Sequence, residues 1–398
     1  MTSNKIISSI LSCLIVQLFL TAGLPAQSVD FQGQLTSWIL TNPNQHFETQ
    51  LGLRYLPELS GQYTISGSQA LDAHLQLNTY GTVFFQKNKT TTDSRLKLYR
   101  ASLRYASARF EARIGLQKIN FGSATLLRPL MWFNRIDPRD PLQLADGVYG
   151  LLLRYFFMNN ANIWIWGLIG NQETRGWDYM PTAKNKAEWG GRFQHPVPSG
   201  EMAFTIHYRE TDIAKGLDNI AAMLGLPSGI VNPEAFATEN PVPETRIGLD
   251  GKWDITIGCW FEAALIHQDI GWMPYKYQRM INIGADYTFG LGNGLHVLYE
   301  HFWYEMADKA LAKGDGLKFS ALSAGYPIGL MDQISSIFYY DWENSEWYRF
   351  INYQRTYDNL IIYLIGFWNP DQFQIYQNLQ QNSLFAGRGL QLMLVFNH

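Results

Sequence analysis

The sequence has few charged residues, and after its first 26 residues it has no long apolar run. Charged residues make up 16% of the 398-residue chain, whereas a soluble globular protein usually carries about 25%. A membrane-spanning helix needs about 20 consecutive apolar residues, and no stretch beyond residue 26 reaches that length. The two absences argue against an ordinary soluble domain and against a helical membrane protein.

Cysteine is almost absent as well. The chain has Cys13 and Cys259, and only Cys259 remains if the first 26 residues are removed. A disulfide-stapled extracellular scaffold is therefore excluded. The HExxH, G-x-S-x-G and paired-cysteine motifs are missing too. We expect no catalytic site, no metal, no cofactor and no nucleic-acid partner.

The first 26 residues resemble a secretory signal peptide. Lys5 supplies positive charge, residues 6–20 are mostly apolar, and Ala26 is a small residue suited to cleavage. A lipoprotein site at Cys13 is the less favoured alternative, because the apolar run continues to Leu20. We therefore divide the chain into a signal peptide at residues 1–26 and one domain at residues 27–398.

After this segment, apolar and polar residues alternate with the period of two that is typical of strands. Between residues 99 and 105, one face carries Tyr99, Ala101, Leu103 and Tyr105, and the other carries polar side chains. An apolar face covers the core of a soluble sandwich, but it faces lipid in a membrane barrel, whose polar face lines a lumen. Few charges, 15% aromatic residues and no spanning helix favour the barrel.

This pattern predicts an all-β, antiparallel, up-and-down transmembrane barrel of about 18 strands, an even number as expected for bacterial barrels. Sixteen strands is the alternative, because the segments near residues 190 and 351 alternate weakly. The predicted strand centres lie near residues 34, 51, 77, 100, 113, 152, 165, 190, 205, 248, 261, 282, 299, 320, 337, 351, 364 and 391.

The connections alternate in length, as they do between the two ends of an outer-membrane barrel. Short turns, rich in Asn and Gly, separate long connections such as residues 118–146 and 211–242. Residues 213–224 have enough Ala and Leu for a short helix. If both chain ends are periplasmic, the long connections are extracellular, and residues 118–146 form the third of them. Aromatic residues near the strand ends predict interfacial girdles.

Positive charge gathers between residues 87 and 154, which contain 13 basic and five acidic residues. Four arginines there share the lumen phase on three successive strands, which neighbour each other in a sheet at about 4.8 Å. Rows of arginine in pores select for anions, so we predict a basic ladder that acidic neighbours partly neutralise. The residues predicted to line the pore are Arg100, Arg104, Glu111, Arg113, Gln117 and Arg154.

The connection at residues 118–146, rich in Pro and Arg, is the predicted constriction of the lumen. At this strand number a barrel is too wide for its own side chains to fill, so a loop must narrow it. The charged residues predicted at this constriction are Arg128, Arg135, Asp137, Arg139 and Asp140.

The same region resembles a known family. Residues 114–122 read IGLQKINFG and residues 128–140 read RPLMWFNRIDPRD. This looks like a signature of the alginate-export-type outer-membrane porins, in which a strand GRQ-x-I-x-WG leads into a loop containing NP-x-D. Leu116 stands in place of the Arg, Phe121 in place of the Trp, and Arg135 interrupts the Asn-Pro pair. The resemblance implies an outer-membrane pore whose basic lumen passes acidic or sugar-like solutes.

The sequence thus predicts a passive outer-membrane porin that favours anionic or sugar-acid-like solutes. The expected partners are the lipid bilayer, lipopolysaccharide, the barrel-assembly machinery and those small solutes. The alternative is a non-transporting outer-membrane barrel, either a surface-binding scaffold or a barrel enzyme. His207 and Arg209 face the lumen by phase and are the residues that such an enzyme could use.

Overall fold

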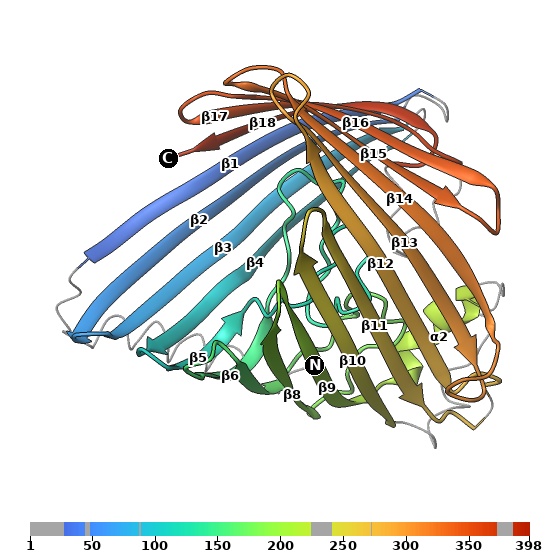
Figure 1. Ribbon diagram of the computed structural model, residues 1–398. Helices are drawn as coiled ribbons and strands as arrows, with labels where there is room; N and C mark the ends of the chain where they lie inside the picture. The colour runs from blue at the N-terminus through green and yellow to red at the C-terminus, as the bar shows by residue number, and fades with distance from the viewer. Residues whose placement is uncertain (1–27, 44–47, 87–88, 224–240, 272, 372–384) are drawn as a thin grey trace.

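The computed structural model describes residues 28–43, 48–86, 89–223, 241–271, 273–371 and 385–398. The predicted signal peptide lies outside these residues. The described chain forms one closed antiparallel barrel of 18 strands (Figure 1). Each strand pairs with its neighbours in sequence, and β1 pairs with β18 to close the ring.

The barrel also carries one described helix, α2, and its elements have the following bounds: β1 Ser28–Asn42, β2 Glu48–Ser66, β3 Gln69–Gln86, β4 Lys89–Ala106, β5 Phe110–Gln117, β6 Val148–Phe156, β7 Asn162–Ile169, β8 Ala187–Val197, β9 Gly200–Thr211, α2 Ile213–Met223, β10 Val242–Asp254, β11 Gly258–Gln268, β12 Tyr277–Phe289, β13 Leu295–Ala307, β14 Asp315–Pro327, β15 Asp332–Asp341, β16 Glu346–Thr356, β17 Leu360–Trp368 and β18 Arg388–Asn397.

The prediction of 18 strands is confirmed, and each predicted centre falls within a strand. The two weakly alternating segments form β8 and β16. They pair with both neighbours along most of their length. Hydrogen bonding to the adjacent strands therefore stabilises these two strands, although their own sequences alternate weakly. The short helix is confirmed as α2.

The two faces of the strands differ in the way a membrane barrel requires. Outward-pointing apolar side chains stay exposed, including Ile114 at 51% and Leu151 at 41%, whereas the inward-pointing Leu152 is fully buried. Such an extensive exposed apolar surface is favourable in contact with the hydrocarbon of a membrane and unfavourable in contact with water. No helix in the described part of the chain is long and apolar enough to cross a membrane.

One predicted side-chain direction is wrong. Tyr99 was placed with the outward residues, but the register between β3 and β4 shifts there, and Tyr99 has no partner across the ladder. Its hydroxyl accepts a hydrogen bond from the Ala145 amide inside the barrel, at 3.0 Å. A bulge inserts one residue and puts two successive side chains on one face, so Tyr99 and Arg100 both point inward.

The two ends of the barrel differ. The connections at the end where β1 begins and β18 ends are short, as between β4 and β5 or between β8 and β9. The other end carries the β5–β6 loop (residues 118–147) and the β7–β8 loop (residues 170–186). Both loops lie inside the ring of strands (Figure 1).

Candidate functional site: the lumen wall and the loops that fill it

The polar wall formed by the inner faces of β2–β6 is in contact with water. Its side chains remain partly exposed: His74 at 44%, Glu58 at 37% and Arg104 at 36%. These residues alternate with outward-pointing apolar residues on the same strands, so their exposure is to the lumen. This polar wall is therefore a part of the interior that a dissolved solute can reach.

Three arginines of the polar wall share one carboxylate. Arg104 and Arg113 are cross-strand partners on β4 and β5, and Glu111 faces Arg154 on β6. Glu111 lies 2.9 Å from Arg104, 3.1 Å from Arg113 and 3.6 Å from Arg154. Arg104 also pairs with Asp72 on β3, at 2.8 Å. Three arginines and two carboxylates leave one excess positive charge, so the predicted ladder is assembled but largely neutralised.

Ring stacking and shared hydrogen bonds hold the arginines of this group in place. The Arg154 guanidinium stacks over the Trp164 ring, 3.7 Å from its centroid. Glu111 is buried beneath the three arginines, and a carboxylate that receives several charged hydrogen bonds fixes the positions of its donors. The guanidinium groups are therefore preorganised along one strip of the wall.

The other two predicted pore-lining residues serve the structure. Gln117 is buried, and its amide donates to the carbonyls of Arg113 and Gly150, at 3.1 and 3.0 Å. Arg100 donates to the Ala145 carbonyl at 2.6 Å and thereby ties the end of the β5–β6 loop to β4. Neither side chain is free to bind a solute with the groups it uses here.

The β5–β6 loop crosses the lumen and docks on the far wall. Two buried carboxylates receive its backbone: Glu262 on β11 and Glu300 on β13. Glu262 accepts from the amides of Ala124 and Leu130, at 2.7 and 3.1 Å. Glu300 accepts from three successive amides at 2.6, 3.0 and 2.7 Å, those of Thr125, Leu126 and Leu127.

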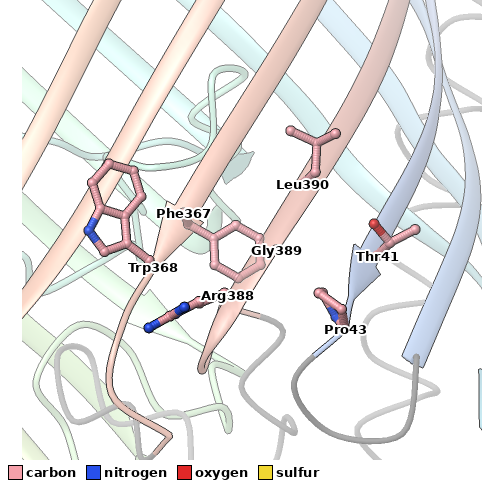
Figure 2. A pocket seen from close by; sticks show the side chains of 7 residues that line it. All are labelled: Thr41, Pro43, Phe367, Trp368, Arg388, Gly389 and Leu390. Carbon is pink, nitrogen blue, oxygen red and sulfur yellow. The ribbon is translucent and has the colours of Figure 1, made fainter.

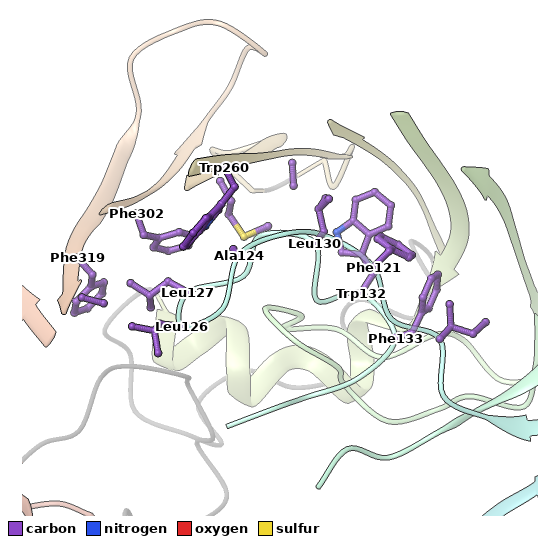
Figure 3. Close-up of a cluster of buried hydrophobic side chains, with 14 of the residues drawn as sticks. Phe121, Ala124, Leu126, Leu127, Leu130, Trp132, Phe133, Trp260, Phe302 and Phe319 are labelled. Carbon is purple, nitrogen blue, oxygen red and sulfur yellow. The ribbon is translucent and has the colours of Figure 1, made fainter. Parts of the chain in front are cut away.

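An apolar cluster reinforces this docking. Leu126 and Leu127 of the loop face Phe302 and Phe319 of the wall, and the loop residues Trp132 and Phe133 continue the cluster towards β7 and β9 (Figure 3). All are buried. Burial of a large side chain contributes about 1.5–3 kcal/mol, so the loop is a packed part of the barrel.

Two glycines permit close approaches of the loops. Gly122 has a φ of +94°, and a Cβ there would overlap Glu262 Oε1. Gly176 in the β7–β8 loop has a φ of +51°, and a Cβ there would overlap the carbonyl oxygen of Met131. Other residues rarely adopt this backbone region, so both positions require glycine for conformation and for space.

The five predicted constriction residues all lie in the docked loop. Arg128 bonds to Asn120 and to the Phe121 carbonyl, at 2.6 and 2.9 Å. Arg139 pairs with Asp137 and lies over the rings of Phe350 and Phe385, 5.5 and 5.0 Å from their centroids. Arg135 and Asp140 complete the set. These charges hold the loop in shape, and most of them are turned away from water.

Burial changes the ionisation of several loop groups. It raises the pKa of the Asp140 carboxyl, although the positive charge of nearby Arg54 acts to lower that pKa. Burial, together with the positive charges of Arg100 and Arg128, lowers the pKa of the Lys118 ammonium. Burial also lowers the pKa of Arg135. All three shifts have the same leading cause, the withdrawal of these loop side chains from water.

The inner face of β8–β10, which is separated from the polar wall by β7, contains a buried ion-pair network that sequence analysis did not identify. Arg209 and Arg246 each pair with Glu244 and with Asp178 of the β7–β8 loop, and all four are at most 3% exposed. Arg192 pairs with Asp250 at 2.6 Å. Arg175 of the same loop pairs with Glu188 on β8, at 2.7 Å.

This network seals the wall of β8–β10 beneath the loops. His207, which could have served an enzyme, is 1% exposed and bonded to Glu188 and Trp166. The alternation of charged residues along each strand indicated which of them point inward. These residues are Glu188 and Arg192 on β8, and Glu244 and Arg246 on β10. Nothing in the sequence showed that the loops would cover them.

Comparisons with known proteins show the fold. No protein-family model matches the sequence, and no curated protein matches it. Among solved structures, OccAB4 of Acinetobacter baumannii superposes with a TM-score of 0.57 at 8% identity, covering 94% of this chain and 99% of that chain.

Two Pseudomonas aeruginosa structures are similar to the same degree. OccK5 (OpdH) gives a TM-score of 0.56 at 10% identity and covers 94% of this chain and 99% of that chain. OccD3 (OpdP) gives 0.57 at 9% identity, with 94% and 92% covered. At these identities the likeness is one of barrel fold alone. The resemblance of residues 114–140 to alginate-export-type porins is not supported by these comparisons and stays a prediction.

Proposed function

We propose that the protein is an outer-membrane porin through which small anionic solutes diffuse along the inner faces of β2–β6. The observation that carries this proposal is the contrast between two walls. Five ionisable side chains of the β2–β6 wall are 19–44% exposed to the lumen, namely Glu58, His74, Arg104, Arg113 and Arg154. In contrast, the charged side chains that β8, β9 and β10 contribute to the ion-pair network are at most 5% exposed.

The chemistry of the solute follows from the excess charge. Arg104, Arg113 and Arg154 present partly exposed guanidinium groups to the lumen, and two carboxylates offset two of the three charges. A preorganised guanidinium binds carboxylates and phosphates well. The polar side chains around it can hydrogen-bond hydroxyls, so the narrower proposal is a sugar-acid-like solute.

Location in the outer membrane follows from the barrel and its exposed apolar surface. Closed barrels satisfy every backbone hydrogen bond within the ring, which is why strands can cross hydrocarbon. The same reasoning predicts lipid and the barrel-assembly machinery as partners.

The test is current through single proteins in planar bilayers. A conducting pore with a reversal potential on the anion-selective side in a salt gradient supports the proposal. The rival is a plugged, non-transporting scaffold, which the packed β5–β6 loop makes a specific alternative; it would insert without any conductance. A conducting but cation-selective pore would support the porin function and contradict the proposal of an anionic solute.

A further inference from the structure

A row of cations and tryptophans follows the outer surface of β13–β18 at the long-loop end. We call it the outer-rim row, and it consists of Trp303, Lys318, Trp342, Trp347, Arg349, Trp368 and Arg388. Side chains at alternate positions point inward and are buried, such as Phe350 and Phe367. Leu390, two residues after Arg388 on the same face, is 51% exposed. The outer-rim row therefore lies on the lipid-facing surface.

The register brings the cations and rings together. Arg349 on β16 is the cross-strand partner of Trp368 on β17, which is in turn the partner of Arg388 on β18. With about 4.8 Å between strands, the two arginines stand about 10 Å apart with a tryptophan between them. Lys318 on β14 pairs with Trp303 on β13 in the same way.

The three cations have no carboxylate partner among the described residues, unlike others near this rim. Lys186 pairs with Glu210 at 2.8 Å, and Arg279 with Glu305 at 2.6 Å. The β15–β16 hairpin contains three acids near its turn. Asp341 and Glu346 alternate onto the inner face, and Glu343 in the turn is not among the ion-pair partners of Lys318, Arg349 or Arg388 in the described part of the chain. The outer-rim row thus carries uncompensated positive charge on an apolar surface.

A pocket of 490 Å³ lies at one end of the outer-rim row, where β1, β17 and β18 meet (Figure 2). Trp368, Arg388 and Leu390 line it together with Thr41 and Pro43 of the neighbouring chain segment. It thus combines a guanidinium, an indole and apolar surface. A group with a phosphate and an attached acyl chain would match each of these.

We propose that the outer-rim row binds the phosphate groups of lipopolysaccharide in the outer leaflet. Cations on a lipid-facing surface are costly at mid-depth and are stabilised at the headgroup level, where tryptophan also concentrates. Arginine binds phosphate through paired hydrogen bonds. The inference rests on the proposed outer-membrane location, with both termini on the periplasmic side, because only that orientation puts the row in the outer leaflet.

The test compares lipopolysaccharide retained by the purified full-length protein. The variant Lys318→Gln/Arg349→Gln/Arg388→Gln should bind it more weakly than the wild type, by roughly tenfold for each charged hydrogen bond to phosphate that is removed. Arg355→Gln is the matched control, because Arg355 lies on the same face of the same strand as Arg349 but at the opposite end. Native mass spectrometry counts the bound molecules. Equal retention by all three proteins would overturn the proposal.

Defined probes then establish what is bound. In nanodiscs, lipid A with its phosphates should bind the wild type more tightly than dephosphorylated lipid A. Equal binding of the two would exclude phosphate recognition, and equal binding of phosphatidylglycerol would exclude lipopolysaccharide as the specific ligand. If the triple variant does not fold, as judged by heat-modifiable gel mobility, the same comparison is made with Arg388→Gln alone.

The outcome is independent of pore function. In a phospholipid bilayer, the triple variant should conduct as the wild type does, since none of its substitutions faces the lumen. A wild-type protein that binds lipid A but does not conduct would contradict the proposed porin function and support lipopolysaccharide binding by the outer-rim row.

Discussion

At the scale of single residues, Glu111 decides how basic the lumen is. It lies within 3.6 Å of three arginines on three adjacent strands. Without it, those arginines would repel one another across distances at which like charges are unfavourable. Glu111 therefore keeps the guanidinium groups close together while removing part of their positive field.

The charges on this strip should set the selectivity of the pore. Replacing Arg104 and Arg113 together with Gln removes two charges and keeps length and polarity. The reversal potential in a salt gradient should move from anion-selective towards neutral. The shift should be largest at low salt, because the Debye length falls from about 8 Å at physiological ionic strength to about 3 Å at 1 M. Glu111→Gln should move it in the opposite direction.

A control for this experiment lies on the same strand. Arg95 is 66% exposed and pairs with Asp93, near the mouth of the barrel, so Arg95→Gln should change the reversal potential less. If the double variant and Glu111→Gln both leave the reversal potential at the wild-type value, the arginine strip does not face the conduction path.

Sequence reasoning placed Arg104, Glu111, Arg113 and Arg154 together because strand alternation and strand order are both readable from the pattern. It failed at Tyr99, where a bulge adds one residue to β4. It also failed for Gln117, whose buried amide serves the backbone. Both errors concern contacts made by the folded chain, which periodicity does not encode.

At the scale of elements, the β5–β6 loop is held by two carboxylates that face its backbone. Five amides of the loop donate to Glu262 and Glu300. Hydrogen bonds to charged groups contribute about 1.5–3 kcal/mol each, and a buried donor left without an acceptor costs a further amount. The position of the loop thus depends on strands that are far from it in sequence.

Glu262→Gln and Glu300→Gln together should loosen the loop. A neutral amide accepts more weakly than a carboxylate and presents one oxygen where two were used, so several loop amides would lose their partner. We expect larger and noisier single-channel currents and faster proteolysis within residues 118–147. Gly122→Ala should act in the same direction, through overlap with Glu262.

Glu305→Gln is the control for the glutamate pair, because Glu305 lies on the same strand as Glu300 but points outward to Arg279. It should leave current and proteolysis unchanged. Quiet, wild-type currents in the double variant would mean that the apolar cluster alone positions the loop.

The sequence indicated that this loop narrows the barrel, because it is long, is rich in Pro and Arg, and is the third of the predicted extracellular connections. It did not indicate where the loop docks. Glu262 and Glu300 are isolated acids on otherwise ordinary strands, and their role depends on a contact between segments more than 130 residues apart.

At the scale of the whole molecule, the direction of every side chain depends on one alternation carried around 18 strands. Its apolar phase faces outward, as the exposure of Ile114 and Leu151 shows. Few charges, many aromatics and alternating segments were enough to predict this architecture, since a barrel repeats one simple rule in each strand. How the interior is filled could not be predicted, because loop packing follows no such rule.

This assignment of faces predicts a difference between outward and inward substitutions. Ile114→Arg or Leu153→Arg puts a charge into hydrocarbon, at a cost of about 2–4 kcal/mol near the midplane. Ser60→Arg puts the same charge into the water-exposed lumen and should be tolerated. Folded yield, read from heat-modifiable gel mobility, should fall for the first two variants only. Equal yields for all three would contradict the assignment.

The proposed conduction path runs along the β2–β6 wall and not along the sealed β8–β10 wall, and this is the central claim. Single cysteines test it directly in a background in which Cys259 is replaced by Ser. Ser60, beside His74 on the open wall, and Thr205, fully buried beside Arg192, are each replaced with Cys.

Current through single pores is then recorded while a water-soluble thiol reagent is added. If solutes pass along the β2–β6 wall, the reagent lowers the current of the Ser60→Cys pore and leaves that of the Thr205→Cys pore unchanged. A block confined to Thr205→Cys, or a barrel that carries no current before the reagent is added, would contradict the claim.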